Sequence, residues 1–109
     1  MNKEALKKRL LSMLALARKA GKVTAGEESC EKAIRGGAAL LVHVACDASA
    51  NTQKKFGNKA KFYDVPIYSL FTKEEISRAT GLHNRATFVV TDQSFATKIK
   101  EFIEELQPL

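Results

Sequence analysis

The chain has 109 residues, 45% of them apolar and 28% charged, which is the composition of one soluble globular domain with a core of its own. Its formal net charge is +6, and residues 1–62 carry 13 Lys and Arg against 5 Asp and Glu, whereas residues 63–109 carry 5 against 7. We find neither a secretory signal nor an apolar run long enough to span a membrane, so we expect a cytoplasmic protein without a membrane partner.

The first helix is predicted from periodicity and from the residues at its two ends. Apolar residues recur at helical spacing between Leu6 and Ala17. Asn2 is suited to cap the start of this helix. Gly21 is suited to the position just after its end, so we expect the helix to stop near Lys19.

A second helix is expected between two glycine signals. It follows a short extended piece at 23–24, begins at Gly26 and carries two glutamates in its first turn, where the helix dipole favours carboxylates. The pair Gly36-Gly37 ends it. The apolar run at 40–45 (LLVHVA) then predicts a strand covered on both faces.

The next part of the chain predicts a weak helix and a strand. Residues 49–63 are rich in lysine and only weakly helical, because Gly57 interrupts them. A strand is expected at 66–70 (PIYSL), since proline is tolerated at the first position of a strand.

Two helices and one strand complete the predicted order. Thr72 and Glu75 form a capping box that opens a helix ending near Gly81. A strand is expected at 87–91 (TFVVT), and Asp92 can cap a last helix with a clear apolar stripe.

Helices and strands therefore alternate, with short connections and with no internal repeat or linker. This order predicts the α/β class, as a three-layer α/β/α sandwich around a small mixed four-stranded sheet. The whole chain, 1–109, is expected to form a single domain.

The sequence offers no recognisable catalytic or metal-binding pattern. His43 lies in a predicted buried strand and is expected to be a satisfied core residue. Cys30 and Cys46 have neither metal-ligand nor redox spacing and are expected to be small buried apolar residues. Nucleophile-elbow and phosphate-loop motifs are absent, so we expect no enzyme, no cofactor and no metal.

Two segments remain as candidates for binding a polyanion. A helix that begins at Gly26 presents bare backbone N–H groups, which favour an anion, and basic residues surround it in the sequence. The loop 81–85 (GLHNR) places an apolar side chain beside polar groups and a cation, a combination suited to covering an unstacked base. In an α/β sandwich both segments can lie at one end of the sheet, although an ordinary basic soluble protein is the alternative.

Four stretches together resemble a known family, and the likeness covers nearly the whole chain. They are residues 17–21 (ARKAG), 26–37 (GEESCEKAIRGG), 44–47 (VACD) and 79–82 (ATGL). The chain resembles the ribosomal kink-turn RNA-binding superfamily (the L-seven-Ae and L-thirty-e type), and within it the bacterial YlxQ-type branch. The resemblance implies an α/β/α sandwich that grips a sharply bent internal loop of RNA.

In that family a Gly-Ala-Asn-Glu motif followed by a Lys contacts the sheared G·A pairs, and a second loop covers the bases expelled from the bulge. By resemblance, Gly26 and Lys32 match this motif. Glu27, Glu28 and Ser29 stand where the family has Ala, Asn and Glu. The chain's Leu82 matches the apolar member of the base-covering loop.

The departure at Glu28 changes the chemistry of the motif. Guanine presents the acceptors O6 and N7 in the major groove, which an amide NH₂ can satisfy and a carboxylate cannot. A carboxylate also repels phosphates unless a flanking lysine pairs with it. Weaker kink-turn binding, a different contact set or another RNA are the alternatives that follow.

The function expected from the residues and the resemblance is non-enzymatic binding of structured RNA, most simply a kink-turn-like internal loop, by a monomer that is ribosomal or ribosome-associated. A protein–protein adaptor built on the same sandwich is the alternative, and an RNA-modifying enzyme is a more distant one. The candidate RNA-binding residues are Lys19, Lys22, Gly26, Glu27, Glu28, Ser29, Lys32, Arg35, Gly81, Leu82, His83, Asn84 and Arg85.

Overall fold

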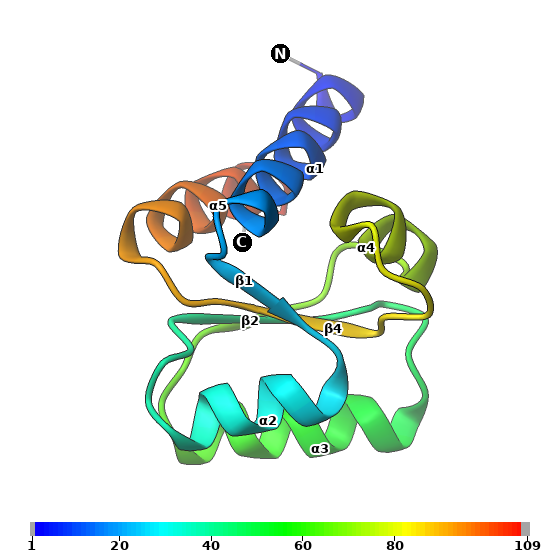
Figure 1. Ribbon diagram of the computed structural model, residues 1–109. Helices are drawn as coiled ribbons and strands as arrows, with labels where there is room; N and C mark the ends of the chain where they lie inside the picture. Colours follow the sequence, from blue (N-terminus) through cyan, green and yellow to red (C-terminus); the bar gives the residue numbers. More distant parts are fainter. Residues whose placement is uncertain (1, 108–109) are drawn as a thin grey trace.

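The computed structural model describes residues 2–107, in which helices and strands alternate as expected (Figure 1). The elements are α1 (Lys3–Lys19), β1 (Val23–Ala25), α2 (Glu27–Arg35), β2 (Leu41–Val44), α3 (Ala50–Phe62), β3 (Ile67–Tyr68), α4 (Lys73–Thr80), β4 (Thr87–Val90) and α5 (Gln93–Leu106).

The four strands form one mixed sheet in the order β1-β4-β2-β3. β4 is antiparallel to both of its neighbours, β1 and β2, whereas β2 and β3 are parallel. β1 and β2 therefore run in the same direction, and α2 connects them. α3 connects the parallel pair β2 and β3 in the same way, so α2 and α3 run parallel to each other.

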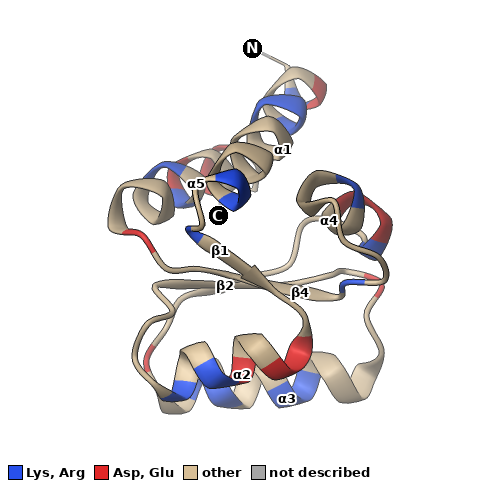
Figure 2. Cartoon of the chain, viewed as in Figure 1, with Lys and Arg blue, Asp and Glu red and all other residues tan. Residues whose placement is uncertain are grey.

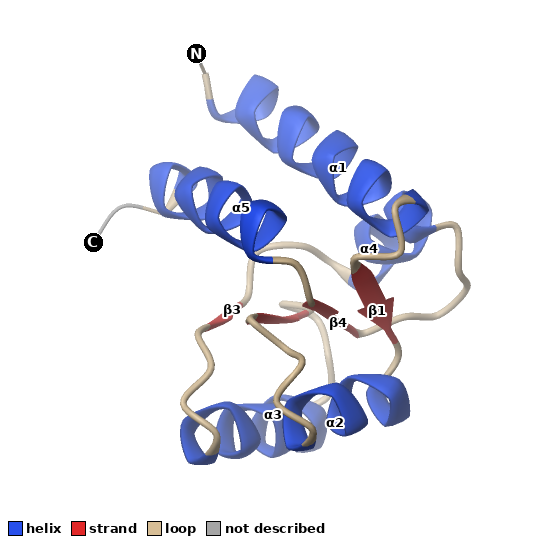
Figure 3. Ribbon diagram, turned by 60° about the vertical axis from the view of Figure 1, so that its left-hand side comes forward, coloured by secondary structure: helices blue, strands red, loops and turns tan. Residues whose placement is uncertain are grey.

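The helices cover both faces of the sheet, which confirms the three-layer α/β/α sandwich. Helices α1, α4 and α5 lie on one face, and α2 and α3 lie side by side on the other (Figures 1 and 3). All four residues of β2 and all four of β4 are buried, because both strands lie in the middle of the sheet. The unbroken apolar run that predicted β2 is the sequence signal of this double coverage.

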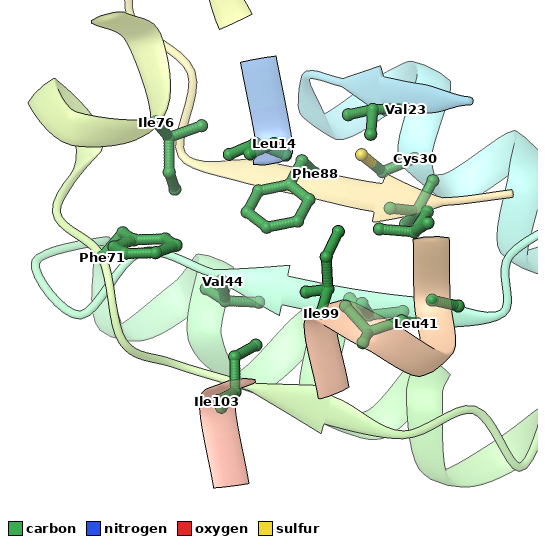
Figure 4. Packing of buried hydrophobic residues seen from close by; sticks show 14 of the residues in the cluster. Leu14, Val23, Cys30, Leu41, Val44, Phe71, Ile76, Phe88, Ile99 and Ile103 are labelled. Atoms are coloured by element: carbon green, nitrogen blue, oxygen red, sulfur yellow. The ribbon is translucent and has the colours of Figure 1, made fainter. Parts of the chain in front are cut away.

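The core fills the space between the sheet and α1, α4 and α5 and continues under α2. Figure 4 shows Phe88 of β4 among Leu14, Phe71 and Ile76, side chains that come from three separate segments. Each of these four residues is buried. Burial of apolar side chains from every layer is what fixes the sheet relative to the helices.

Four of the five helices in residues 2–107 begin with a side-chain cap. Asn2, Ser49, Thr72 and Asp92 each accept a hydrogen bond from a backbone N–H in the first turn of the helix that follows. Thr72 also forms the predicted capping box with Glu75. The helix without such a cap is α2, which follows Gly26.

The structure differs from the sequence-based expectations in three places. Residues 50–62 form a full α-helix despite Gly57, because the Ser49 cap and the buried Phe56 fix it against the sheet. β3 is shorter than expected, with only two residues, since it is paired on one side alone. Cys46 is exposed in the turn after β2, so its expected burial is wrong, whereas Cys30 is buried.

Candidate nucleic-acid interface

The two candidate segments meet at one edge of the molecule. β1 and β4 are antiparallel, with Ala25 opposite Phe88, so the end of β1 lies beside the start of β4. The N–H of Gly26 donates to the carbonyl of Thr87 at 3.0 Å, which continues the pairing by one more bond. The start of α2 and the loop that leads into β4 are therefore adjacent, an arrangement that the sequence allowed but did not require. We refer to them together as the Gly26 edge.

The contact between Gly26 and Arg85 is the closest link within this edge. A Cβ atom placed on Gly26 would lie 3.6 Å from both Cδ and Nε of Arg85, so the arginine side chain rests on the bare glycine backbone. The N–H of Arg85 donates to the hydroxyl of Ser77 at 2.9 Å, which fixes its backbone to α4. Its Nε is buried and has no hydrogen-bond partner within residues 2–107.

The start of α2 presents unoccupied backbone donors at the same place. Gly26 has φ +101° and ψ 146°, a conformation that is essentially restricted to glycine, and it supplies no capping side chain. The first-turn N–H groups of Glu27, Glu28 and Ser29 have no intrahelical acceptor. These donors, the positive end of the helix dipole and the arginine favour an anion here, whereas the carboxylates of Glu27 and Glu28 lie in the same turn and oppose one.

Glu27 is held by α3 and is not free at this edge. Its Oε1 lies 2.9 Å from Nζ of Lys55, and its Oε2 accepts a hydrogen bond from the hydroxyl of Thr52 at 3.3 Å. Lys55 also pairs with Glu31 at 3.2 Å. Hydrogen bonds from its ammonium to Glu27 and Glu31 raise the pKa of Lys55. Lys55 and Thr52 lie far along the sequence from Glu27, so the sequence pattern around Glu27 gives no signal of this pairing.

Glu28 and Lys32 are paired with each other one helical turn apart. Their charged groups are 3.8 Å apart, and the side chains are 86% and 69% exposed. A pair this long and this exposed contributes little to stability. The flanking lysine anticipated from the sequence is therefore present, and both groups can rearrange around a ligand.

The loop 81–85 completes the edge with an apolar residue. Gly81 ends α4 with φ +74°, and the N–H of Leu82 donates to the carbonyl of Ser77 at 3.1 Å. Asn84 also has a positive φ, +53°, which asparagine tolerates better than most residues. Leu82 is half-buried and, with exposed His83, lines a shallow groove of about 350 Å³ beside the end of α4.

Three of the candidate basic residues do not lie at this edge. Lys19 and Lys22 precede β1, whereas Gly26 follows it, and three extended residues span about 10 Å. Arg35 is the last residue of α2, about 13 Å along the helix from its start. Basic residues are consequently spread over α1, α2 and α3 (Figure 2). The structure brings together Gly26 and Arg85, with Glu27, Glu28 and Ser29 in the first turn of α2.

Side chains that could do chemistry are few in the described part of the chain. Burial raises the pKa of the Cys30 thiol to about 11, so this sulfur is a packed thiol that donates to the carbonyl of Thr24. Within residues 2–107 no three His, Cys, Asp or Glu side chains gather as a metal site would require. No helix among these residues has the length and apolar character needed to cross a membrane.

Comparison with known proteins gives one family over most of the chain. The sequence profile of the ribosomal protein L7Ae/L30e/S12e/Gadd45 family matches residues 8–100. The chain is 41% identical over 101 residues to the RNA-binding protein YlxQ of Enterococcus faecium, a match that covers 93% of this chain and 97% of that protein. It is 38% identical over 92 residues to the RNA-binding protein YlxQ of Bacillus subtilis (strain 168), with coverage of 84% and 92%.

Solved structures share the fold. A protein of unknown function from Bacillus halodurans superposes with a TM-score of 0.83 at 34% identity, covering 87% of this chain and 96% of that chain. A 15.5kD RNA binding protein of Giardia lamblia superposes with a TM-score of 0.78, covering 98% and 91%. At 18% identity, the second likeness shows the fold alone.

Proposed function

Because the chain belongs to the ribosomal protein L7Ae/L30e/S12e/Gadd45 family, within its YlxQ branch, we propose that it binds structured RNA without catalysing a reaction. The two YlxQ relatives are named RNA-binding proteins. The RNA that the Gly26 edge suits best is a sharply bent internal loop of the kink-turn type.

The observation that carries this proposal is the contact of Arg85 with Gly26. It joins the uncapped start of α2 to the loop 81–85, two segments that are separated by more than fifty residues in the sequence. Phosphate or a base edge bound there would meet backbone N–H donors and a guanidinium at once. Such an anion would also give the buried Nε of Arg85 the partner that it lacks in residues 2–107.

Leu82 supports the choice of a bent RNA over a regular duplex. A duplex offers phosphates and groove edges, whereas a bulge also offers unstacked bases. The half-buried Leu82 precedes Arg85 by three residues in the same loop and lines a groove beside the end of α4, where an expelled base can pack against it. Lys32, one turn into α2, is available to a phosphate once Glu28 releases it.

The proposal extends to the setting in which the protein works. A basic member of a ribosomal-protein family suits a ribosomal or ribosome-associated role in the cytoplasm, with ribosomal RNA as the partner of a monomer. RNA that co-purifies with the protein and is then sequenced should be enriched in G·A-flanked bulges. Recovery of RNA without such bulges would remove the kink-turn part of the proposal.

Gel shift against a kink-turn RNA and a duplex of equal length, at the same moderate salt, tests the proposal. We expect a clear preference for the kink-turn RNA and its loss in Arg85→Gln, with Lys100→Gln as a control that removes one charge from α5. Equal affinity for the two RNAs would reduce the protein to a general polyanion binder. Protein partners that survive nuclease treatment, with no RNA preference, would favour the adaptor alternative.

A further inference from the structure

We propose that the outer face of α3 is a second RNA-binding surface, which takes a single-stranded segment that flanks the structured element bound at the Gly26 edge. We call it the α3 face, and it consists of Lys54, Gly57, Asn58, Lys61 and Phe62. The inference rests on the proposed function in that it takes the ligand to be RNA.

These residues lie on one side of the helix. Lys54, Gly57, Asn58 and Lys61 have the spacing i, i+3, i+4 and i+7, which places them in one stripe. Lys54, Asn58, Lys61 and Phe62 are exposed, whereas Phe56 and Ala60 point to the core. The stripe therefore faces away from the sheet. Figure 3 shows α2 and α3 together as one layer on this side of the sheet.

The charge of this face is not neutralised by the protein. α3 contains four lysines and no acidic residue. Lys55 is held by Glu27 and Glu31, but Lys54 and Lys61 have no acidic partner among the residues described. Their positive charge is thus available to phosphate groups.

α2 contributes a further cation toward the C-terminal end of the layer. The two helices run parallel, and Lys55 of α3 contacts Glu27 and Glu31 of α2. One turn further along each helix, Lys59 of α3 and Arg35 of α2 are therefore expected to lie beside each other. Neither has an acidic partner in residues 2–107, so the acidic half of α2 is followed by a purely basic half.

Gly57 has no structural reason to be glycine. Its φ is not positive, and a Cβ atom placed on it would meet nothing within 4 Å. Glycine inside a helix lowers stability relative to alanine, so the fold itself does not favour it. A bare backbone in the middle of a basic stripe leaves room for a close approach by a sugar-phosphate chain.

An exposed aromatic pair stands at the end of the stripe. Phe62 is 80% exposed, and its ring lies edge-on to that of Tyr63, with 4.9 Å between the centroids. Tyr63 is 39% exposed, so the pair packs on itself and not into the core. Lysines followed by a free aromatic face are the combination with which proteins hold single strands, because every base can stack on a ring. An acidic protein partner would satisfy the lysines but would not need a stacking platform.

The test compares one kink-turn RNA with blunt stems and the same RNA with a single-stranded uridine tail on its 5′ or its 3′ end. Wild type, Lys54→Gln/Lys61→Gln, Phe62→Ala and Phe62→Tyr are titrated with each RNA. Lys98→Gln/Lys100→Gln on α5 is the matched control, since both of these lysines are exposed. Thermal unfolding of each variant verifies that these surface changes leave the fold intact.

We expect one of the tails to raise the affinity of wild type. Phe62→Ala should remove about fivefold or more of that gain, and Phe62→Tyr should restore it, because a ring is what stacking requires. The double lysine variant should also lose the gain, and its dependence on salt should weaken by about 0.7 in logarithmic slope for each phosphate that the protein no longer neutralises. Binding of the blunt RNA should be unchanged in these variants.

The inference is overturned if neither tail raises the affinity of wild type, if the gain survives both kinds of variant, or if the α5 control loses it equally. Failure of the proposed function gives a different pattern, in which blunt kink-turn RNA binds no better than blunt duplex. In that case the tail is moved to the duplex, and the same variants still report on the α3 face.

Discussion

The Arg85 side chain lies on the backbone of Gly26, with Cδ and Nε both 3.6 Å from the position of a Cβ atom on that glycine. The positive end of the α2 dipole and a guanidinium are thus held together, although they repel each other weakly and no acidic side chain pairs with Arg85 within residues 2–107. An anion that contacts both of them relieves this repulsion. The arrangement depends on the glycine, whose bare backbone lets the arginine approach.

Replacement of Gly26 by alanine is expected to destabilise the protein. The added methyl group has room, because 3.6 Å is an ordinary contact distance, but φ +101° is strained for any residue with a Cβ atom. We expect a loss of about 1–3 kcal/mol in the free energy of unfolding, measured by urea denaturation. An unchanged midpoint would mean that the start of α2 can relax without cost.

Gly57→Ala is expected to have the opposite effect. The backbone at Gly57 is helical, and the new side chain would extend into open space. Alanine reduces the freedom of the unfolded chain and favours the helix, so stability should rise by about 0.5–1 kcal/mol in the same urea assay. A loss of stability would show that a neighbour of Gly57 is closer in solution than in this structure.

Lys32→Ala and Leu82→Ala are expected to weaken binding of a kink-turn RNA in different ways. Without Lys32 one phosphate is no longer neutralised, so this variant should show a smaller dependence of affinity on salt, by about 0.9 in logarithmic slope. Without Leu82 an expelled base has no apolar side chain to pack against, so affinity should fall by roughly tenfold with the salt slope unchanged. Because Leu82 is only half-buried, its variant should still unfold cooperatively. If both variants bind like wild type, the Gly26 edge is not the surface that the RNA uses.

His43 should make the protein sensitive to mild acid. It is fully buried between the rings of Phe71 and Phe88, and its Nε2 accepts the N–H groups of Leu70 and Phe71 at 2.9 and 3.1 Å. Burial lowers the pKa of His43 from 6.5 to about 3, although the charge of nearby Glu75 raises it in part. The unfolded state therefore binds a proton below pH 6.5 that the folded state refuses, and stability is lost progressively from there down to about pH 3.

Protonation of His43 in the unfolded state should have a measurable effect on stability. Between pH 7 and 5 the free energy of unfolding should fall by about 2 kcal/mol, as measured by urea denaturation at each pH. Burial alone would raise the pKa of Glu75, but hydrogen bonds from Thr72 and the Lys7 ammonium lower it below 4.5. Protonation of Glu75 therefore reduces stability only at a lower pH than this range. His43→Gln should be less stable than wild type at pH 7, but its stability should depend less on pH over this range. If the free energy of unfolding of His43→Gln depended on pH as steeply as that of wild type, another group would be the cause of the acid sensitivity.

The fold can be predicted largely because its signals are local. The caps Asn2, Thr72 and Asp92 act within one turn of their helices, so their sequence context is sufficient. β3 is shorter than its sequence predicts because the length of an edge strand depends on its single neighbour, which residues 66–70 do not reveal. Cys46 follows an apolar run, which favours burial, but the chain turns outward there.

The candidate site is less predictable, since its contacts join distant segments. The sequence points to both Gly26 and Arg85, but only the pairing of β1 with β4 brings them together. The bond between Glu27 and Lys55 depends on how α3 packs beside α2, which no local pattern reveals. Lys19, Lys22 and Arg35 are near Gly26 in the sequence, whereas β1 and α2 each carry the chain away from this edge.

Glu28→Asn is expected to strengthen binding of a kink-turn RNA. Asparagine supplies an NH₂ donor for the O6 and N7 acceptors of guanine, which the carboxylate cannot provide, and it removes a negative charge from the Gly26 edge. It also releases Lys32 from a pair that is 3.8 Å long and highly exposed, so little stability should be lost. Glu28→Ala separates the two causes, because it removes the charge without adding a donor. Gel shift should rank affinity as Asn above Ala above wild type. If Asn and Ala gain equally, charge is the sole cause, and a loss in both would mean that Glu28 itself accepts a hydrogen bond from the RNA.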